Sequence, residues 1–191
     1  PKQVNEKALK IAVQMCKLLH CHIVDEIHVM RKTVVDGSSV SGFQRTALVG
    51  LNGYVEGNFI GGVGKVGIQT AMLEEDAATP IAKGEGMIEY RLDRLGIPLV
   101  EIATDSSINS PEMAKQVAEH IGLLLRSVDV VRGIGSIRQD INISIEGGSR
   151  VEIKGFQELD KIPDIVENEV RRQLSLLEIK NELKKRGFKS I

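Results

Sequence analysis

The stretch GSIRQDINISIEGGSRVEIKG, residues 135–155, consists of two strictly alternating segments joined by a Gly-Gly pair. Strand side chains alternate between the two faces of a sheet, so this pattern predicts a β-hairpin with one apolar face and one charged face. The polar positions are Arg138, Asp140, Asn142, Ser144, Arg150, Glu152 and Lys154.

The length of the hairpin loop decides whether the polar side chains of the two strands lie on the same face of the hairpin. They do so if the loop holds an odd number of residues, and a three-residue loop drawn from 146–149, with one left-handed glycine, meets that condition. The result is either a solvated outer face or the floor of a polar site. Cross-strand pairs such as Asp140 with Lys154 are ordinary sheet stabilisation, contributing roughly 0.2–1 kcal/mol each. Asp, Asn and Ser are nevertheless poor strand formers, and functional sites often break local preferences.

The composition is that of a globular domain. With 191 residues, 42% hydrophobic and 27% charged, the chain is long enough for one domain, or for one domain and a fragment of a second. It has no apolar run of roughly 18 residues and no signal-peptide pattern, so we expect no membrane span and a cytoplasmic location. A net charge of −1 and 3% aromatic residues argue against a sequence-independent nucleic-acid grip.

Two cysteines, Cys16 and Cys21, are too few for a disulfide framework, and a reduced pair is expected. Together with His20 and His22 they match no closed structural zinc pattern.

Periodicity and turn signals predict an α+β fold with a mostly antiparallel sheet of several hairpins, flanked by about three helices. Helices are expected over 4–20, with Asn5 as candidate N-cap, over 111–127, with Ser110 as N-cap, and over 160–186, with Pro163 a candidate interruption of the last. Strands are expected over 23–35, 43–51, 66–73, 86–92 and 99–103, besides the hairpin. Residues 36–42 are expected to form a turn, 52–64 a loop or tight hairpin, and 77–85 a loop.

Acidic residues concentrate where strands are expected to end. Glu74, Glu75 and Asp76 are consecutive, and Glu101 interrupts an apolar run. Carboxylate oxygens are the ligands of hard cations such as Mg²⁺, which usually takes one or two of them with substrate phosphates and water. A plain acidic surface cluster remains the alternative.

Basic side chains accompany these acids. Arginine and lysine near a metal suit a phosphorylated substrate, although they suit a salt-bridged surface equally well. The chain has no P-loop, no GxGxxG and no HExxH motif, so the common nucleotide and zinc folds do not apply. The basic residues concerned are Arg31, Lys32, Arg45, Arg91, Arg94, Arg138 and Lys154.

Five motifs, taken together and in order, resemble the B/E-type subunit family of the glutamyl-tRNA(Gln) amidotransferases, most closely its archaeal E-type branch. They are RKTVVDGSSVSGFQRTALV (31–49), LEEDA (73–77), YRLDRLGIPLVEIAT (90–104), GSIRQDINISI (135–145) and RVEIKG (150–155). The resemblance covers essentially the whole chain.

This resemblance implies an ATP- and Mg²⁺-dependent enzyme that phosphorylates the γ-carboxyl of glutamate on tRNA(Gln) and lets ammonia displace the phosphate. It also implies an asparaginase-like amidotransferase partner of the D type as the ammonia source, and a homodimer of the E-type protein within a heterotetramer. The Glu-tRNA(Gln) substrate would be gripped mainly by domains outside this chain.

The resemblance also implies roles for particular residues. Metal ligation falls to Glu74 or Glu75, between which the choice is open, and to Glu101. The polar pocket wall, with catalytic roles in phosphate and substrate positioning, comprises Arg138, Asp140, Glu152 and Lys154. Weaker candidates for contacts to the nucleotide or the tRNA end are Arg31, Lys32 and Arg45.

The chain departs from the family pattern at both ends. The family begins with a strand carrying a Glu-x-His metal motif that is missing here, and it continues into further domains. We therefore expect residues 1–158 to be the central part of the catalytic domain, with 159–191 a long helix leading onward, and no amidotransferase activity from this chain alone. Alternatives are a non-catalytic tRNA-binding or subunit-assembly module, and a different ATP-dependent carboxylate-activating enzyme.

Overall fold

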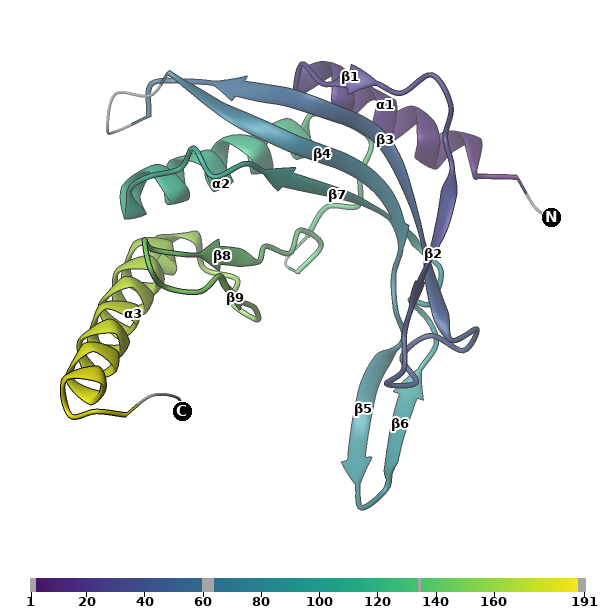
Figure 1. Cartoon of the computed structure of the whole chain (residues 1–191). Coiled ribbons are helices and arrows are strands. Elements are labelled where there is room, and N and C mark those ends of the chain that lie inside the picture. Colours follow the sequence, from purple (N-terminus) through teal and green to yellow (C-terminus); the bar gives the residue numbers. More distant parts are fainter. Residues whose placement is uncertain (1–2, 60–63, 134, 189–191) are drawn as a thin grey trace. The chain divides into compact units, whose positions relative to one another are not determined.

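The computed structural model describes residues 3–59, 64–133 and 135–188, and confirms the α+β class (Figure 1). Its contacts divide the chain into two units. The first comprises residues up to 57, 64–107 and 124–130, and the second comprises 58–63, 108–123 and the chain from 131 onward.

The first unit contains a five-stranded antiparallel sheet with the order β1-β3-β4-β7, in which β2 also pairs with β3. A separate two-stranded hairpin, β5–β6, projects beyond it (Figure 1). The strands of this unit are β1 (His22–Ile23), β2 (Val29–Thr33), β3 (Phe43–Glu56), β4 (Lys65–Glu75), β5 (Thr79–Gly84), β6 (Met87–Arg91) and β7 (Pro98–Thr104).

Helix α1 (Glu6–Leu18) packs on one face of this sheet. It begins where predicted, because the Asn5 side chain accepts a hydrogen bond from the Ala8 N–H at 3.0 Å. Its apolar side shares a core cluster with the sheet, made of Ala8, Ala12, Cys16, Val49, Ala71 and Leu73. We call this side of the sheet the α1 face and the opposite side the far face.

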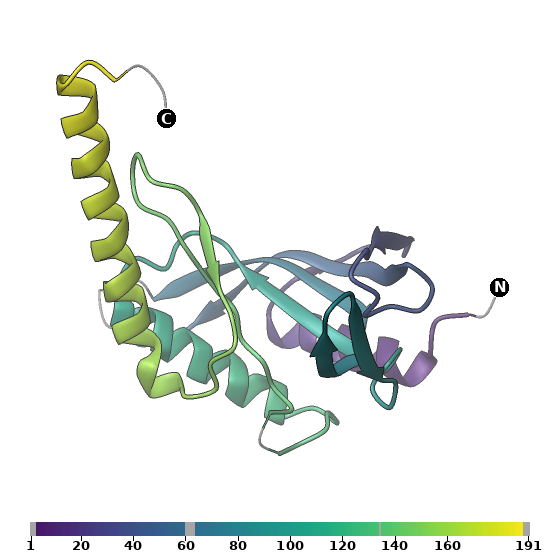
Figure 2. The ribbon, with the colours of Figure 1, turned by 90° about the horizontal axis from the view of Figure 1, so that it is seen from below.

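The second unit contains the first part of α2 (Pro111–Arg126), the hairpin β8 (Ile141–Ile143) and β9 (Val151–Ile153), the short 3₁₀ turn η1 (Leu159–Lys161) and α3 (Ile162–Lys185). The Ser110 hydroxyl caps α2 by accepting from the Met113 N–H at 3.1 Å. The β8–β9 hairpin lies beside α3 (Figure 2), where the Gln173 amide donates to the Ile143 carbonyl at 3.3 Å.

The strand predicted over 23–35 is wrong as a single element. It is two strands, β1 and β2, which pair one after the other along β3. The first pairing ends at Ile23 with Gly50 and the second begins at Val29 with Ala47. Between them β3 carries a register shift, and the exposed acids of residues 24–28 favour an excursion over a strand.

Two predicted loops are shorter than expected. Strand β3 continues through Asn52 and Gly53 to Glu56, so only 57–64 is left for the turn into β4, and 60–63 lie outside the described residues. Glycine at 53 reflects close packing, since a Cβ there would lie 2.4 Å from the Leu19 carbonyl oxygen. The loop predicted over 77–85 is mostly β5, which accommodates Pro80 because it belongs to a two-stranded ribbon.

The hairpin predicted over 135–155 is confirmed, but its strands are shorter and its loop spans residues 144–150 instead of the three residues predicted within 146–149. Its register pairs Asn142 with Glu152, which leaves an odd loop, and Gly147 has the expected left-handed φ of 75°. The strands span three residues each, in keeping with the poor strand propensity of their polar positions. Pro163 does not interrupt α3 but lies in its first turn, where proline is tolerated. The predicted division at residues 158 and 159 stays a prediction.

Candidate carboxylate site

The register of β4 and β7 places two of the predicted metal ligands on the far face. Leu73 belongs to the α1 core, and Val100, its partner on β7, packs against the same core. Glu74 and Glu101 each follow one of these residues, so alternation directs both carboxylates away from α1. Thr46 pairs with Glu74 from the other side and shares the far face.

Glu74 is a buried and well-bonded carboxylate, 9% exposed. Its Oε1 accepts from the Thr46 hydroxyl at 2.7 Å and from Lys32 Nζ at 3.2 Å. The Gln44 amide lies 3.5 Å from the Oε2 atom and donates to the Glu75 carbonyl at 2.6 Å. These partners satisfy one carboxylate oxygen strongly and hold the group in one orientation, because a buried charge is stable only when bonded.

Glu101 and Glu75 differ in their relation to Glu74. Glu101 is exposed and pairs with Met72, which makes it the diagonal neighbour of Glu74, a relation that typically spans about 7–8 Å. Glu75 lies on the α1 face, where its Oε1 is 2.7 Å from Arg45 Nη2. The structure therefore brings Glu74 and Glu101 to one face and separates Glu75 from them.

The far-face pair offers the type of ligand that a phosphate-bound magnesium ion takes from a protein. Within the described ranges, no group of three or more His, Cys, Asp or Glu side chains is arranged to hold a metal by itself. Two carboxylates from neighbouring strands are nevertheless the usual protein share of a Mg²⁺ shell that phosphate oxygens and water complete. Glu74 and Glu101 would hold such an ion, with the Thr46 and Gln44 side chains orienting Glu74.

The residues predicted to contact the nucleotide or the tRNA end do not form one cluster. Lys32 is on the far face with Glu74. Arg31 on β2 and Arg45 on β3 lie opposite each other in the strand register, on the α1 face. The Arg31 guanidinium lies over the Phe43 ring at 5.5 Å. Only Lys32 therefore accompanies the candidate carboxylate site.

The predicted polar wall lies on the β8–β9 hairpin of the second unit. Lys154 Nζ is 3.1 Å from Asp140 Oδ2 and 3.1 Å from Glu152 Oε2, as the odd loop predicts. The hydrogen bond that Lys154 donates to Asp140, and next the one that it donates to Glu152, raise the pKa of Lys154 above 10.5. Arg138 precedes the strand and is exposed. The hairpin thus presents an exposed charged face.

Sequence reasoning missed the residues that position these acids. Thr46 and Gln44 belong to the 31–49 motif without standing out in it, although their spacing of two places both on the face of Glu74. Asp76, expected to be a metal candidate or a surface acid, is 5% exposed and bonds Arg94 at 2.7 Å. This ion pair between a buried carboxylate and a partly exposed arginine joins the end of β4 to the turn before β7, and no periodic pattern in the sequence predicts it.

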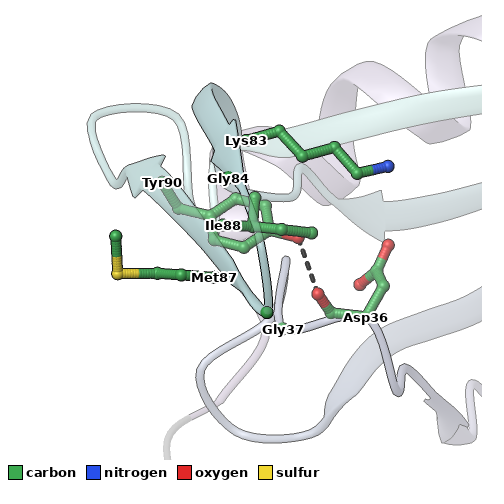
Figure 3. A pocket seen from close by; sticks show the side chains of 8 residues that line it. Asp36, Gly37, Lys83, Gly84, Met87, Ile88 and Tyr90 are labelled. Carbon is green, nitrogen blue, oxygen red and sulfur yellow. Dashed lines mark hydrogen bonds between the residues drawn. The ribbon is translucent and has the colours of Figure 1, made fainter.

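A pocket of about 560 Å³ lies elsewhere in the first unit, between the turn at Asp36 and Gly37 and the β5–β6 hairpin (Figure 3). The Tyr90 hydroxyl closes one side by donating to the Asp36 carbonyl at 2.6 Å. None of the predicted site residues lines it.

Fold and site together define an α+β domain with a candidate two-carboxylate metal site. The chain belongs to the GatB/GatE catalytic domain family, whose family model matches residues 1–190. It is similar to the glutamyl-tRNA(Gln) amidotransferase subunits E of Thermococcus sibiricus (59% identical over 190 residues, 99% of this chain) and of Archaeoglobus fulgidus (57% over 188 residues, 98% of this chain). The chain spans about 30% of the length of either relative. Among the described residues, no helix has the length and apolar character needed to cross a membrane.

Proposed function

We propose that this chain is part of the catalytic domain of a tRNA-dependent amidotransferase that converts Glu-tRNA(Gln) to Gln-tRNA(Gln). Family membership and the names of relatives at 54–59% identity support the proposal. The chain covers only about 30% of those relatives, so the activity belongs to the longer protein, and the 191 residues alone are inactive.

The reaction has two steps with a balanced exchange of bonds. A γ-carboxylate oxygen of the glutamyl group attacks the terminal phosphorus of ATP, and ADP leaves. Ammonia then attacks the acyl carbon, inorganic phosphate leaves as the C–O bond breaks, and the nitrogen loses a proton. A carboxylate is a poor electrophile, so the phosphate supplies the leaving group that amidation requires.

The far face supplies the metal-binding part of this chemistry. Glu74 and Glu101 would hold Mg²⁺, which would offset the negative charge that develops on the transferred phosphoryl group. Lys32 contacts Glu74 Oε1 on the far face, and in this proposal its ammonium group binds a phosphate oxygen there. The single observation that carries this assignment is the common face of Glu74 and Glu101 with a pre-oriented Glu74.

The β8–β9 hairpin supplies substrate positioning in this proposal. Its exposed side chains Arg138 and Lys154 offer cationic groups to the glutamyl carboxylate or the transferred phosphate, while Asp140 and Glu152 hold Lys154 in place. Ammonia comes from an asparaginase-like partner of the D type, and the E-type protein forms a homodimer within a cytoplasmic heterotetramer. ATP and Glu-tRNA(Gln) are the other substrates.

The proposal is tested by Gln-tRNA(Gln) formation from Glu-tRNA(Gln), ATP, Mg²⁺ and an ammonium salt. The complete protein that contains this chain forms the product, and the chain alone does not. In the complete protein Glu74→Gln and Glu101→Gln abolish product formation, while the matched control Glu75→Gln retains it. Full activity of both far-face variants refutes the metal assignment, and product from the chain alone refutes its inactivity.

A further inference from the structure

Cys16 and Cys21 lie next to each other at the end of α1. Cys16 is in the last turn of the helix, and Cys21 directly precedes β1. The Cys21 N–H donates to the Cys16 carbonyl at 2.8 Å. Standard bond lengths then keep the two Cα atoms within about 7 Å of each other. Disulfides span Cα separations of roughly 4.4–6.8 Å, so the backbone already has the required spacing.

Both side chains also pack against glycines of β3. A Cβ added to Gly50 would lie 2.6 Å from Cys16 Sγ and 3.0 Å from Cys21 Cβ, and one added to Gly53 would lie 2.5 Å from Cys21 Sγ. The two cysteines therefore lie over neighbouring glycines of one strand, and their thiols contact each other. Cys16 is fully buried there and Cys21 is partly exposed, so an external reagent reaches Cys21 first.

The protonation of the pair sets the conditions under which it reacts. Burial, and next the neighbouring Cys21, raise the pKa of Cys16 to about 11. Burial also raises the pKa of Cys21, although its contact with Cys16 counteracts this. Because the thiolate is the reactive form, oxidation of the pair is slow near neutral pH and accelerates as the pH rises.

We propose that Cys16 and Cys21 form a reversible intramolecular disulfide that joins the end of α1 to the start of β1. The oxidant is a small disulfide such as oxidised glutathione. The Cys21 thiolate attacks one sulfur of the oxidant and releases one glutathione. The Cys16 thiolate then attacks Cys21 Sγ and releases the second glutathione. The protein loses two electrons and two protons, and both are recovered in the two glutathione thiols.

The bond would brace the α1 face and leave the far face unchanged. Cys16 belongs to the core cluster between α1 and the sheet, whereas Glu74 and Glu101 point away from that cluster. Oxidation therefore raises the melting temperature without changing metal binding at the far face. The proposal is independent of the amidotransferase assignment.

The test treats the native chain with mixtures of oxidised and reduced glutathione, followed by an alkylating agent and mass spectrometry. The oxidised protein is expected to lose two hydrogen atoms and to take up no alkyl group. Trypsin cleaves after Lys10, Lys17 and Arg31, so the two cysteines fall in different peptides that remain joined until reduction. The rate is expected to rise about tenfold per pH unit while the pH stays below the thiol pKa values.

Two variants show whether Cys16 completes the reaction. In Cys16→Ser and in Cys16→Ala, Cys21 should stop at the mixed disulfide with glutathione. The alanine variant covers the case in which a hydroxyl is not tolerated at this fully buried position. Wild-type protein that also stops at the mixed disulfide, keeps two alkylatable thiols at every ratio, or links its peptides only between molecules overturns the proposal.

Discussion

The far face of the β3–β4–β7 sheet and the charged face of the β8–β9 hairpin carry the same kinds of side chain in different surroundings. Glu74 on the far face is 9% exposed, and Lys154 on the hairpin is 61% exposed. Both have oppositely charged partners at hydrogen-bond distance. The difference lies in the solvent, which competes for Lys154 and is largely excluded from Glu74.

Because of this difference in solvent exposure, Glu74 is held in one orientation, whereas Lys154 is able to change its partners. A buried carboxylate that loses a partner keeps its full desolvation penalty, whereas an exposed ammonium recovers hydration. Glu74 is thus held in one geometry by its sheet neighbours, as a metal ligand needs to be. Lys154 is able to exchange its carboxylate partners for a substrate anion at little cost.

The largest expected effect concerns metal binding at the far face. Glu74→Gln and Glu101→Gln should each weaken Mn²⁺ binding at least tenfold. Loss of a residue that only orients a metal ligand already weakens metal binding about tenfold or more, and loss of the ligand itself should cost no less. The measurement is the electron paramagnetic resonance signal of free Mn²⁺ during titration of the chain. Glu75→Gln is the matched control, because its carboxylate lies on the α1 face and should leave the titration unchanged. Equal weakening by all three variants would contradict a site confined to the far face.

The next effect concerns the hydroxyl that holds Glu74. Thr46→Val keeps the shape of the side chain but removes the donor to Glu74 Oε1, and should lower the free energy of unfolding by about 1–3 kcal/mol. The measurement is urea denaturation. Thr33→Val, at an exposed position of the neighbouring strand β2, should change it by less than about 0.5 kcal/mol. Equal effects at the two positions would mean that Glu74 is not held by Thr46.

The third prediction concerns a buried carboxylate of the second unit, whose contribution to stability should depend on its charged partner. Glu169 is 7% exposed and accepts from Arg172 at 2.7 Å, which lowers the pKa of its carboxyl below 4.5. Its ionised form therefore stabilises the fold above pH 4.5, and this contribution is lost as the pH falls through the depressed value. Glu169→Gln should lower the melting temperature near neutrality, and the difference from wild type should shrink in acid. A difference that stays constant with pH would contradict this account.

The smallest effect is expected on the hairpin. Lys154→Ala should lower the free energy of unfolding by less than about 1 kcal/mol, and added salt should reduce the difference. Because Asp140 and Glu152 raise the pKa of Lys154, its contribution is present below pH 10.5 and fades as the pH rises beyond that value. Lys83→Ala, on the exposed strand β5, is the control and should show a weaker dependence on salt. A decrease in the free energy of unfolding well above about 1 kcal/mol would contradict the view that Lys154 behaves as an exposed group.

Local patterns predicted most elements of this fold. The Asn5 and Ser110 caps, the helical periods that follow them and the odd loop of the β8–β9 hairpin are all confirmed. Errors occur where a distant contact overrides local preference. Gly53 was expected to mark a loop, but it lies in a strand because the chain after α1 packs against it too closely for a side chain. The predicted strand over 23–35 is divided because β3 changes register opposite it.

The candidate site was predicted in part for the same reason. Acids beside expected strand ends were visible in the sequence, and so were the basic residues near them. The partners of Glu74 were not visible, because Thr46 and Lys32 reach it from β3 and β2, 28 and 42 residues away in the chain. Long-range pairing of this kind follows from strand order and register, which a single sequence does not display.

The sequence by itself determined that neighbouring side chains of a strand point to opposite sides, but the strand predicted over 66–73 ended before Glu74 and Glu75, and only the structure shows that β4 includes both. It also determined that the charged positions of the β8–β9 hairpin share one side, once the loop is odd. Only the tertiary structure decided which of the two acids accompanies Glu101. The two sides of a strand are equivalent until something packs on one of them, and here α1 covers the side of Leu73 and leaves Glu74 on the other.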